Sequence, residues 1–404
     1  MDWVTCSHAA ACTGIARPPY GLCLFHLPPD RLDAELAALA PARLLDLRGT
    51  RLDPDLLARV LAAVRHRPGR TRLDHARFPG EARLAEVEFA GDVSLNGARF
   101  DRLASFYGSR FLGNVSLVGA GFGRELSFHG ARVLGHLCLD AAGVARDALF
   151  SEAVFARGLS AERAHFDGHT SFDGAVLGET ASLRGARFGH TLSLRKLRGG
   201  ACFERARLLG PVYASVTGRL SFAHAQAGAG VDLAVRGGGV DLRHAVVDGP
   251  VRVRLTDSRA DLEGAVLRGR AALSGRGLAG LDSLRRVVAP ELSLTGLDLS
   301  TCRFAGLAHP GGLRVRECSF PLTPRGVRLS LGWPPLRWFT RRRHLADEYG
   351  WRGWSKPVEV VVTTEGQASL RASIDDRDAA SGVALDGTQP PRKAGRRWWR
   401  SPAP

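Results

Sequence analysis

Two interleaved series of apolar residues run through the middle of the chain, each with a period of eleven residues. Between the series, the spacing alternates between five and six residues. A period kept over ten consecutive steps indicates a repeat architecture. The first series is Phe89, Phe100, Phe111, Phe122, Val133, Val144, Phe155, Phe166, Leu177 and Phe188. The second is Leu84, Leu95, Phe106, Leu117, Phe128, Leu139, Phe150, Ala161, Phe172, Leu183 and Leu194.

A small residue usually stands two positions before each apolar anchor. A spacing of two places both side chains on one side of an extended backbone. Gly often precedes the small residue, as in Gly97-Ala98 and Gly185-Ala186, and permits a tight corner. Each unit is therefore predicted to hold one short strand and one turn. The small residues are Ala98, Ala104, Ala120, Ala131, Ala142, Ala148, Ala153, Ala164, Ala175, Ala181 and Ala186.

An eleven-residue period also suits a right-handed coiled coil. Two features of the sequence speak against a coiled coil. Gly recurs through the units, at a cost of about 1 kcal/mol for each one inside a helix, and heptad-like charge pairing is missing. Closed coils stacked on one another fit better, because each coil can pair its backbone with its neighbours and the anchors can form interior ladders.

Segments such as Ala98-Arg99-Phe100, Ala153-Val154-Phe155 and Ala186-Arg187-Phe188 resemble the pentapeptide-repeat family. The resemblance is to its Phe-rich, actinobacterial-type variant with alternating five- and six-residue units. It implies a right-handed quadrilateral β-helix with four faces per coil. Four units make about 22 residues, so residues 73–322 are expected to form about eleven coils and a rod on the order of 50 Å long.

The five/six rhythm weakens after Leu194, returns between Leu262 and Leu284, and weakens again toward Phe304. Two interpretations are open for these parts. Loops could protrude near residues 195–240 and 254–260, as binding loops do in repeat proteins. Degenerate coils are the alternative, and the one favoured here.

Two helices are predicted before the repeats, over Pro29–Leu39 and Pro54–Arg65, within a helical N-terminal cap of residues 29–72. The second begins at Asp53-Pro54, a good cap and first-turn pair. Its apolar stripe is Leu56, Leu57, Val60, Leu61 and Val64. Such helices would cover the open edge of the first coil, which would otherwise invite edge-to-edge aggregation.

Residues 1–28 contain the pattern Cys-x5-Cys-x10-Cys-x2-His, formed by Cys6, Cys12, Cys23 and His26. These are the ligand types of a structural Zn²⁺ site, with knuckle spacing between Cys23 and His26. Zn²⁺ could supply folding energy that so small a module cannot obtain from burial. His8 could replace one ligand, and the alternative is a set of reduced packing thiols. A catalytic zinc is not expected, because no Glu general base lies nearby.

The C-terminal part holds six of the seven Trp residues. A helix is predicted over Leu336–Trp354, inside a basic, Trp-rich cap of residues 323–362, with Arg341, Arg342 and Arg343 at its centre. We interpret it as a cap on the last coil; a surface for nucleic acid or anionic lipid is the sharper alternative. Residues 363–404 have the composition of a disordered tail. The tail ends in a motif suited to phosphate contacts, consisting of Arg396, Arg397, Trp398, Trp399 and Arg400.

The net charge is +16, and only Lys196, Lys356 and Lys393 are lysines. Such Arg-rich composition is typical of GC-rich bacterial genomes, so codon usage accounts for part of it. Residues 73–320 carry 31 basic and 25 acidic side chains, and residues 321–404 carry 15 and 8. The chain has no run of eighteen apolar residues and no signal-like start, and four of its seven Cys are scattered singly through the repeats. We therefore expect a soluble, cytoplasmic protein.

Enzyme signatures are weak. Gly275-x-Gly277-x-x-Gly280 matches a dinucleotide fingerprint, but it lies within the repeat rhythm and lacks the strand–turn–helix context. The leading hypothesis is a non-enzymatic β-helical scaffold that binds a protein partner; its oligomeric state is open, an end-to-end dimer included. One alternative is nucleic-acid binding through the zinc-like module and the tail. The other is DNA mimicry toward a type II topoisomerase, known in one branch of the family, which needs an acidic surface. A linear acidic strip on one outward face would favour mimicry, and a linear Arg strip would favour nucleic acid.

Overall fold

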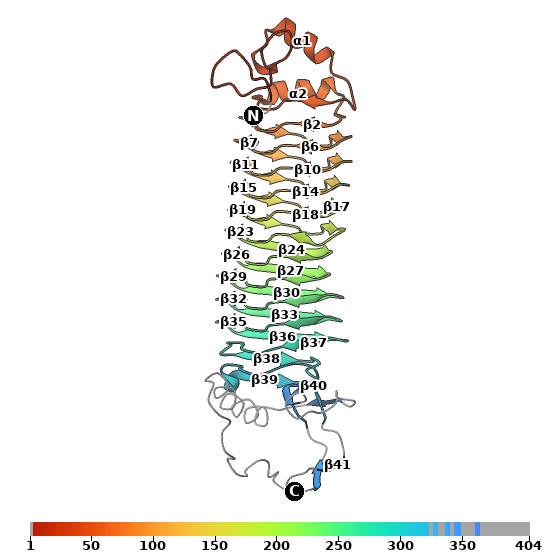
Figure 1. Ribbon diagram of the computed structural model, residues 1–404, viewed down its shortest axis with the longest axis vertical. Helices are drawn as coiled ribbons and strands as arrows, with labels where there is room; N and C mark the ends of the chain where they lie inside the picture. The colour runs from red at the N-terminus through yellow and green to blue at the C-terminus, as the bar shows by residue number, and fades with distance from the viewer. Residues whose placement is uncertain (1–2, 323–325, 330–335, 340–342, 349–359, 364–404) are drawn as a thin grey trace.

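The computed structural model describes residues 3–322, 326–329, 336–339, 343–348 and 360–363. It shows a long rod of stacked coils with the helices at its N-terminal end (Figure 1). Three parallel sheets run along the rod, and one of them has twelve strands, one for each of twelve coils. The predicted β-solenoid is confirmed, at about twelve turns.

The twelve-stranded sheet contains the first strand of the fold. Its members are β1 (Leu45–Asp46), β2 (Thr71–Arg72), β6 (Val93–Ser94), β10 (Val115–Ser116), β14 (Leu137–Cys138), β18 (Leu159–Ser160), β22 (Ala181–Ser182), β25 (Ala201–Cys202), β28 (Leu220–Ser221), β31 (Gly239–Asp241), β34 (Arg259–Asp261) and β37 (Gly280–Ser283).

The ten-stranded sheet occupies a second side of the rod. Its members are β3 (Arg77–Phe78), β7 (Arg99–Phe100), β11 (Gly121–Phe122), β15 (Gly143–Val144), β19 (His165–Phe166), β23 (Arg187–Phe188), β26 (Arg207–Leu208), β29 (Gln226–Ala227), β32 (Val246–Val247) and β35 (Val266–Leu267).

The seventeen-stranded sheet begins as two rows of short strands that later merge into one row of longer strands. The first row is β4 (Ala82–Arg83), β8 (Ala104–Ser105), β12 (Leu126–Ser127), β16 (Ala148–Leu149) and β20 (Thr170–Ser171). The second is β5 (Glu88–Phe89), β9 (Arg110–Phe111), β13 (Arg132–Val133), β17 (Val154–Phe155) and β21 (Val176–Leu177). The merged row is β24 (Leu192–Arg198), β27 (Val212–Thr217), β30 (Val231–Arg236), β33 (Val251–Thr256), β36 (Ala271–Arg276), β38 (Leu292–Thr295) and β39 (Leu313–Arg316).

The merger occurs at β24, which pairs with both β20 and β21 of the preceding coil. Before it, equivalent residues are 22 apart, as in the pairing of Val144 with Phe166. After it, they are 19 to 21 apart, as in Val231 with Val251. The weakened rhythm therefore marks coils that have one corner fewer, and the two predicted protruding loops are replaced by long strands of the sheet. The physical reason lies in the sequence of these strands: β27, for example, alternates buried and exposed residues without interruption, contains no glycine and has no residue with a positive φ at which the chain could turn a corner.

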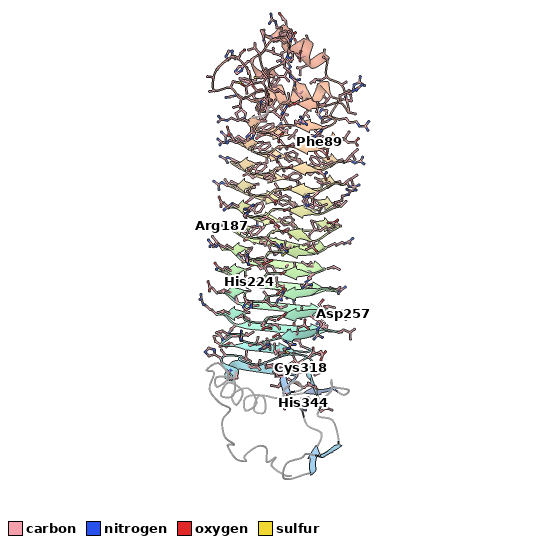
Figure 2. The ribbon with its side chains drawn as sticks, viewed as in Figure 1. Phe89, Arg187, His224, Asp257, Cys318 and His344 are labelled. Carbon is pink, nitrogen blue, oxygen red and sulfur yellow. The ribbon has the colours of Figure 1, made fainter. Side chains whose placement is uncertain are left out.

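The interior is filled by the predicted anchors. Every residue of both series is at most 6% exposed, and the small residues two positions earlier are buried with them. Phe rings of successive coils stack face to face, with centroids 4.4 Å apart for Phe78 and Phe100 and 4.7 Å apart for Phe89 and Phe111. Such rings bury large apolar areas and add a modest stacking contribution. Figure 2 shows Phe89 inside the rod.

The predicted tight corners adopt the left-handed backbone conformation. Gly97 and Gly185 have φ angles of 64° and 63°, values that cost glycine little. Other coils place Glu86, Glu152 or Arg163 at the same kind of corner with φ near 55–57°. The corner geometry is therefore imposed by the coil and not by glycine alone.

The N-terminal helices are α1 (Pro29–Ala37) and α2 (Pro54–Ala63), close to their predicted ranges, with a short 3₁₀ turn η1 (Leu24–His26) before them. The side chain of Asp53 caps α2 by accepting a hydrogen bond from the backbone N–H of Leu56 at 2.9 Å. The whole predicted stripe of α2 is buried.

The solenoid begins earlier than Leu73. β1 pairs with β2, and Arg51 bridges to Arg77, so residues 45–52 already belong to the first coil. Helix α2 follows residues 45–52 directly in the chain and packs against β4 of the next coil. It takes the place that the third and fourth strands hold in later coils. The sequence already shows the repeat in this first coil, because Leu47 and Leu52 are five residues apart and both are buried, at 1% exposed.

The end of the solenoid differs from the prediction. Within the range predicted as a helix over Leu336–Trp354, the first four residues form β42 (Leu336–Phe339), which pairs antiparallel with β41 (Gly326–Leu329). β40 (Cys318–Pro321) follows the 3₁₀ turn η2 (Pro310–Gly312) and β39, and pairs antiparallel with β43 (Val360–Thr363). The helix prediction is therefore wrong for the residues of β42; a Trp- and Leu-rich stretch with alternating Arg suits a strand as well as a helix.

Candidate metal centre and outward faces

The four residues of the N-terminal Cys/His pattern lie together. Two isolated antiparallel bridges, Thr5 with Ile15 and Arg17 with Leu22, fold this segment back on itself. The backbone N–H of Cys6 donates to the carbonyl of Gly14 at 2.7 Å, and the N–H of His26 donates to the carbonyl of Cys23 at 3.0 Å. These turns bring residues 20 positions apart to one point.

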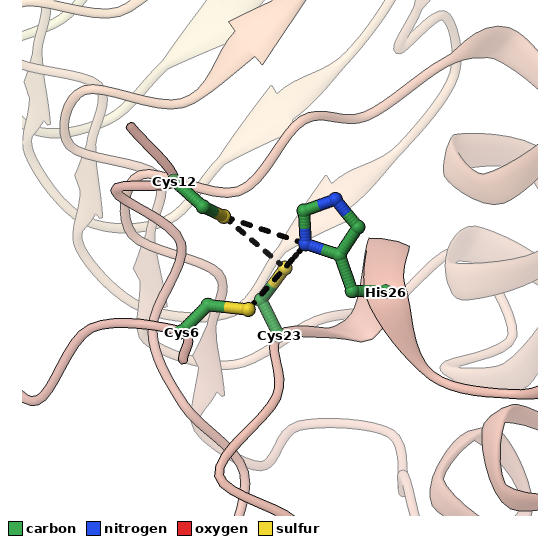
Figure 3. A group of neighbouring side chains, drawn as sticks. All are labelled: Cys6, Cys12, Cys23 and His26. Atoms are coloured by element: carbon green, nitrogen blue, oxygen red, sulfur yellow. Dashed lines mark hydrogen bonds between the residues drawn. The ribbon is translucent and has the colours of Figure 1, made fainter. Parts of the chain in front are cut away.

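The side chains converge on the Nδ1 atom of His26 (Figure 3). The Sγ atoms of Cys6 and Cys23 each lie 3.4 Å from it, and that of Cys12 lies at 3.5 Å. The sulfurs of Cys12 and Cys23 are 3.8 Å apart, and all four ligand atoms lie within 4.8 Å of one another. A single imidazole nitrogen cannot make three good hydrogen bonds to thiols, because it has either one N–H to donate or one lone pair to accept with. The cluster could hold a metal ion.

Burial and backbone contacts set the acidities of these groups. Burial raises the pKa of the Cys23 thiol to about 12. Burial works in the same direction on Cys6, but hydrogen bonds from the backbone of Cys23 and of His8 outweigh it and lower the pKa of Cys6. Burial, and then the neighbouring His8, lower the pKa of His26, which favours the neutral imidazole that metals bind.

A close approach at Gly14 helps to form the cluster. A Cβ atom on this residue would lie 2.7 Å from the Cβ of Cys23 and 2.9 Å from its sulfur. His8, the proposed substitute ligand, is outside the group of four ligand atoms. Its ring instead stacks on that of His26, with centroids 4.0 Å apart.

Of the predicted C-terminal binding residues, only Arg343 lies within the described part of the chain. It is exposed and forms an isolated antiparallel bridge with Leu322. Arg341, Arg342, Arg396, Arg397, Trp398, Trp399 and Arg400 lie outside the described residues. The Gly275–Gly280 motif falls on β36 and β37, two strands of the solenoid, so the repeat accounts for it.

The strand register now places the charges on the outward faces. On the twelve-stranded sheet, acidic side chains are engaged by neighbouring side chains. The guanidinium of Arg243 holds Asp241 at 2.7 Å, and the hydroxyl of Ser182 donates to Glu162 at 2.6 Å. A continuous acidic strip is missing from the described part of this face.

An open groove of about 500 Å³ crosses this face between β22 and β31. Asp241 lies in it, 5% exposed, and accepts two hydrogen bonds from the side chain of Arg243, at 2.9 Å and 2.7 Å. Burial alone would raise the pKa of Asp241, but the hydrogen bonds and charge of Arg243 lower it below the usual value of 3.8.

This lowered pKa predicts acid sensitivity at β31. A carboxylate whose pKa is lower in the folded state stabilises the fold above its unfolded pKa, and that contribution is lost as the pH falls through the folded value. We expect Asp241→Asn to destabilise the coil by about 1–3 kcal/mol at pH 7 and to have little effect well below pH 3.8. Urea denaturation across this pH range measures the difference.

Asp248→Asn is the matched control, because Asp248 pairs with Arg268 in a mostly exposed ion pair. Exposed pairs contribute roughly 0–1 kcal/mol. A constant difference between wild type and Asp241→Asn at every pH would contradict the assignment.

The ten-stranded sheet presents a broken row of basic residues. Its outward positions are Arg77, Arg99, Gly121, Gly143, His165, Arg187, Arg207, Gln226, Val246 and Val266. Arg187 projects from the margin of the rod (Figure 2). The row is interrupted by two glycines and becomes uncharged in the later coils.

The merged row carries a far more uneven charge. We call the outward side of β24, β27, β30, β33, β36, β38 and β39 the flat basic face. These strands contain nine basic residues and one acidic residue. The basic residues are Arg195, Lys196, Arg198, Arg236, Arg252, Arg254, Arg276, Arg314 and Arg316, all exposed. The acidic one is Asp232, which pairs with both Arg252 and Arg254.

This face was missed in the sequence because its members are about 20 residues apart, and their alignment depends on the shortened coil. The available signal was the period-two alternation of apolar and polar residues within each strand, as in Val251–Thr256. That alternation indicates a half-buried strand with one solvated side.

The described part of the chain has no helix long and apolar enough to cross a membrane.

Neither the curated proteins nor the solved structures contain a significant match to the chain. A family model described as "Pentapeptide repeats (9 copies)" matches residues 73–121, 85–132 and 150–198. These stretches form the 22-residue coils with the stacked Phe interior. Within the solenoid, residues 73–132 and 150–198 thus match the pentapeptide-repeat family, and these coils have a Phe-rich buried stack.

Proposed function

We propose that this protein is a non-enzymatic scaffold that binds a macromolecular partner along the side of its rod. The observation that carries the proposal is the flat basic face. Residues 73–320 carry 31 basic and 25 acidic side chains in all. When the nine basic residues and the one acidic residue of the flat basic face are left out, 22 basic and 24 acidic side chains remain, so the positive excess disappears. A compositional excess of Arg would be spread over all faces, whereas this excess lies on one. One-signed surfaces of this kind attract and orient oppositely charged partners.

The solid interior supports the same function. Phe111, Phe128 and Phe150 are fully buried, so the coil encloses side chains. Two open grooves, near Asp241 and near Asp74, both lie on the outside of the twelve-stranded sheet. Partners would therefore meet the outside of the rod, at positions fixed by the coil spacing.

DNA mimicry is the less favoured function. It needs a continuous acidic surface, and the acidic residues of the twelve-stranded sheet are neutralised by Arg or bound by Ser, as at Asp241 and Glu162. The strongest single-signed surface among the described residues is basic.

For the Cys/His cluster we propose a structural Zn²⁺ site. Zn–S and Zn–N bonds of about 2.3 Å and 2.0–2.1 Å in a tetrahedron place the sulfurs about 3.8 Å apart and sulfur and nitrogen about 3.5 Å apart. The separations of 3.8 Å between Cys12 and Cys23 and of 3.4–3.5 Å to His26 fit these values. With Cys6, Cys12, Cys23 and His26 all bound, the ion has no open position, which is typical of structural sites.

Two further features of the fold are part of this proposal. We take the winding of the coil as right-handed, the hand of nearly all crossovers between parallel strands. We also assign to the β40–β43 pairing the role of covering the last strand edge of the solenoid, which would otherwise be open to edge-to-edge association.

Site-specific photo-crosslinking tests the scaffold function. A benzophenone amino acid at Ala272, an exposed position of β36 on the flat basic face, should give macromolecular adducts in cells that produce the protein. The same group at Gln226, an exposed outward position of the ten-stranded sheet, is the matched control and should give few. Equal adducts from both positions, or none from Ala272, would contradict the proposal.

A further inference from the structure

We propose that the flat basic face binds the sugar–phosphate backbone of a nucleic acid. This inference rests on the proposed scaffold function and names the class of partner. The face is a surface of parallel strands whose spacing is fixed at about 4.8 Å per coil. Its seven strands span about 29 Å, the length of roughly eight or nine base pairs at 3.4 Å per pair.

The basic groups form registered rows along the rod. One row passes through Arg198, Thr217, Arg236, Thr256 and Arg276, which are direct partners in successive strands. Arg therefore alternates with Thr, and the arginines stand about 9.6 Å apart, two coils per step. Guanidinium groups bind phosphate oxygens in bidentate fashion, and Thr hydroxyls are common additional donors to phosphates.

The arginines of this row are available to a ligand. Arg198, Arg236 and Arg276 are exposed, and none of them forms an ion pair with a carboxylate of the described residues. On the other faces many arginines are paired, as Arg243 is with Asp241 and Arg259 with Asp282. An unpaired guanidinium gives up no internal partner when it binds phosphate.

A second row adds charge next to the first. Ser215, Ala234, Arg254, Ser274, Thr295 and Arg316 are aligned partners in six consecutive strands. Small side chains and hydroxyls lie between the arginines, so a backbone can approach the sheet without a steric barrier. One-signed, Arg-rich and hydroxyl-bearing surfaces are the electrostatic footprint of nucleic-acid binding.

The residues of this face favour nucleic acid over a lipid surface. Tyr213, 39% exposed, is the one large apolar side chain exposed on its strands, and the guanidinium of Arg195 lies 5.3 Å from the centre of its ring. Binding to a membrane surface is strengthened by apolar side chains that enter the lipid, and these strands offer few. An aromatic ring beside arginines can stack on an unpaired base.

Equilibrium binding by the full chain tests the inference. The probes are a short fluorescein-labelled duplex DNA, a single strand of the same sequence, the corresponding RNA, and vesicles with and without phosphatidylserine. The face variant is Arg198→Gln, Arg236→Gln and Arg276→Gln together. The matched control is Arg99→Gln, Arg187→Gln and Arg207→Gln, which removes equal charge from outward positions of the ten-stranded sheet.

We expect the wild type to bind at least one nucleic acid, with an affinity that falls steeply between about 50 and 200 mM salt. The face variant should bind at least tenfold more weakly. Its slope of log affinity against log salt should shrink by about two to three, close to 0.9 for each duplex phosphate that the protein no longer neutralises. The control variant should change affinity less than threefold. Preference among duplex, single strand and RNA identifies which form the face accepts.

Several results would overturn the inference. Equal reductions in affinity for the face and control variants would show a general effect of net charge. Replacement of Arg396, Arg397 and Arg400 by Gln is a further comparison. If it abolishes binding while the face variant has no effect, the tail and not the flat basic face binds the nucleic acid. Binding to phosphatidylserine vesicles alone would replace nucleic acid by a membrane. Failure of every nucleic-acid probe, combined with protein adducts from position 272, would reject this inference and leave the scaffold function standing.

Discussion

Cys23→Ser is expected to remove a bound metal ion from the N-terminal module. Protein prepared under reducing conditions with zinc supplied should contain about one Zn²⁺ per chain, and the variant should contain almost none. Cys23 is fully buried, and its sulfur lies 3.8 Å from that of Cys12 and 3.4 Å from the His26 nitrogen. A serine oxygen is a much poorer ligand for Zn²⁺ than a thiolate.

The structural consequence should be local but large. Apparent binding energies of structural zinc are roughly 10–16 kcal/mol, more than a short module gains from its own core. Amide protection around Cys6, Gly14 and Ile15 should therefore fall by several orders of magnitude in hydrogen exchange. The stacked coils should keep their protection, because repeat units depend chiefly on their neighbours.

Cys138→Ser is the control for the metal experiment. Cys138 lies on the outward side of β14, far along the chain from the cluster, and its replacement should leave the metal content unchanged. A preparation that contains no metal, or a Cys23→Ser variant that retains it, would show that the four groups are packing residues. Mass spectrometry of the intact folded protein distinguishes these results.

The second large effect is expected inside the Phe stack. Phe128 is fully buried, with its ring centroid 4.6 Å from that of Phe106 and 5.9 Å from that of Phe150. Phe128→Ala should cost about 3–5 kcal/mol, since it removes a large buried ring and leaves a cavity that the rigid coil cannot close. Urea denaturation followed by circular dichroism should show a lower midpoint. It should also show a broader or split transition, because the weakened coil uncouples its neighbours.

Tyr107→Ala provides a comparison within the adjacent coil. Tyr107 is 49% exposed and stacks on His129 at the surface, with centroids 5.5 Å apart. Its replacement should change stability by no more than about 0.5 kcal/mol. A destabilisation below about 1 kcal/mol for Phe128→Ala would mean that the ring stack is not a main source of stability.

Much of the fold could be predicted because the repeat has one structural solution. The anchors at Phe89, Phe100 and Phe111 recur at a period that places them on alternating sides of a closed coil, and burial of all of them requires the coils to stack. The helix α2 was predictable from its Asp53 cap and apolar stripe. The strand β42, at the start of the helix predicted over Leu336–Trp354, was not predictable, because a short segment with mixed periodicity takes the structure that its pairing partner offers, here β41.

The candidate sites divide in the same way. Ligand types and spacing indicated Cys6, Cys12, Cys23 and His26, since these metal-binding residue types stand close together in the sequence. His8 could not be placed from spacing alone, and only the fold showed that it stacks on His26. The flat basic face could not be recognised from a local motif, because neighbours such as Arg236 and Arg276 are 40 residues apart in the sequence.

The sequence by itself determined the coil, its Phe-filled interior and the chemistry of the N-terminal cluster, because each depends on spacings within one or two repeat units. The tertiary structure decided where the four-cornered coil becomes shorter by one corner, and hence which charges share a face. The shortening by two or three residues per coil brings Arg198 into register with Thr217 and Arg236. Register is a property of paired strands and not of either strand alone, so the uneven charge of the rod emerges only when the coils are stacked.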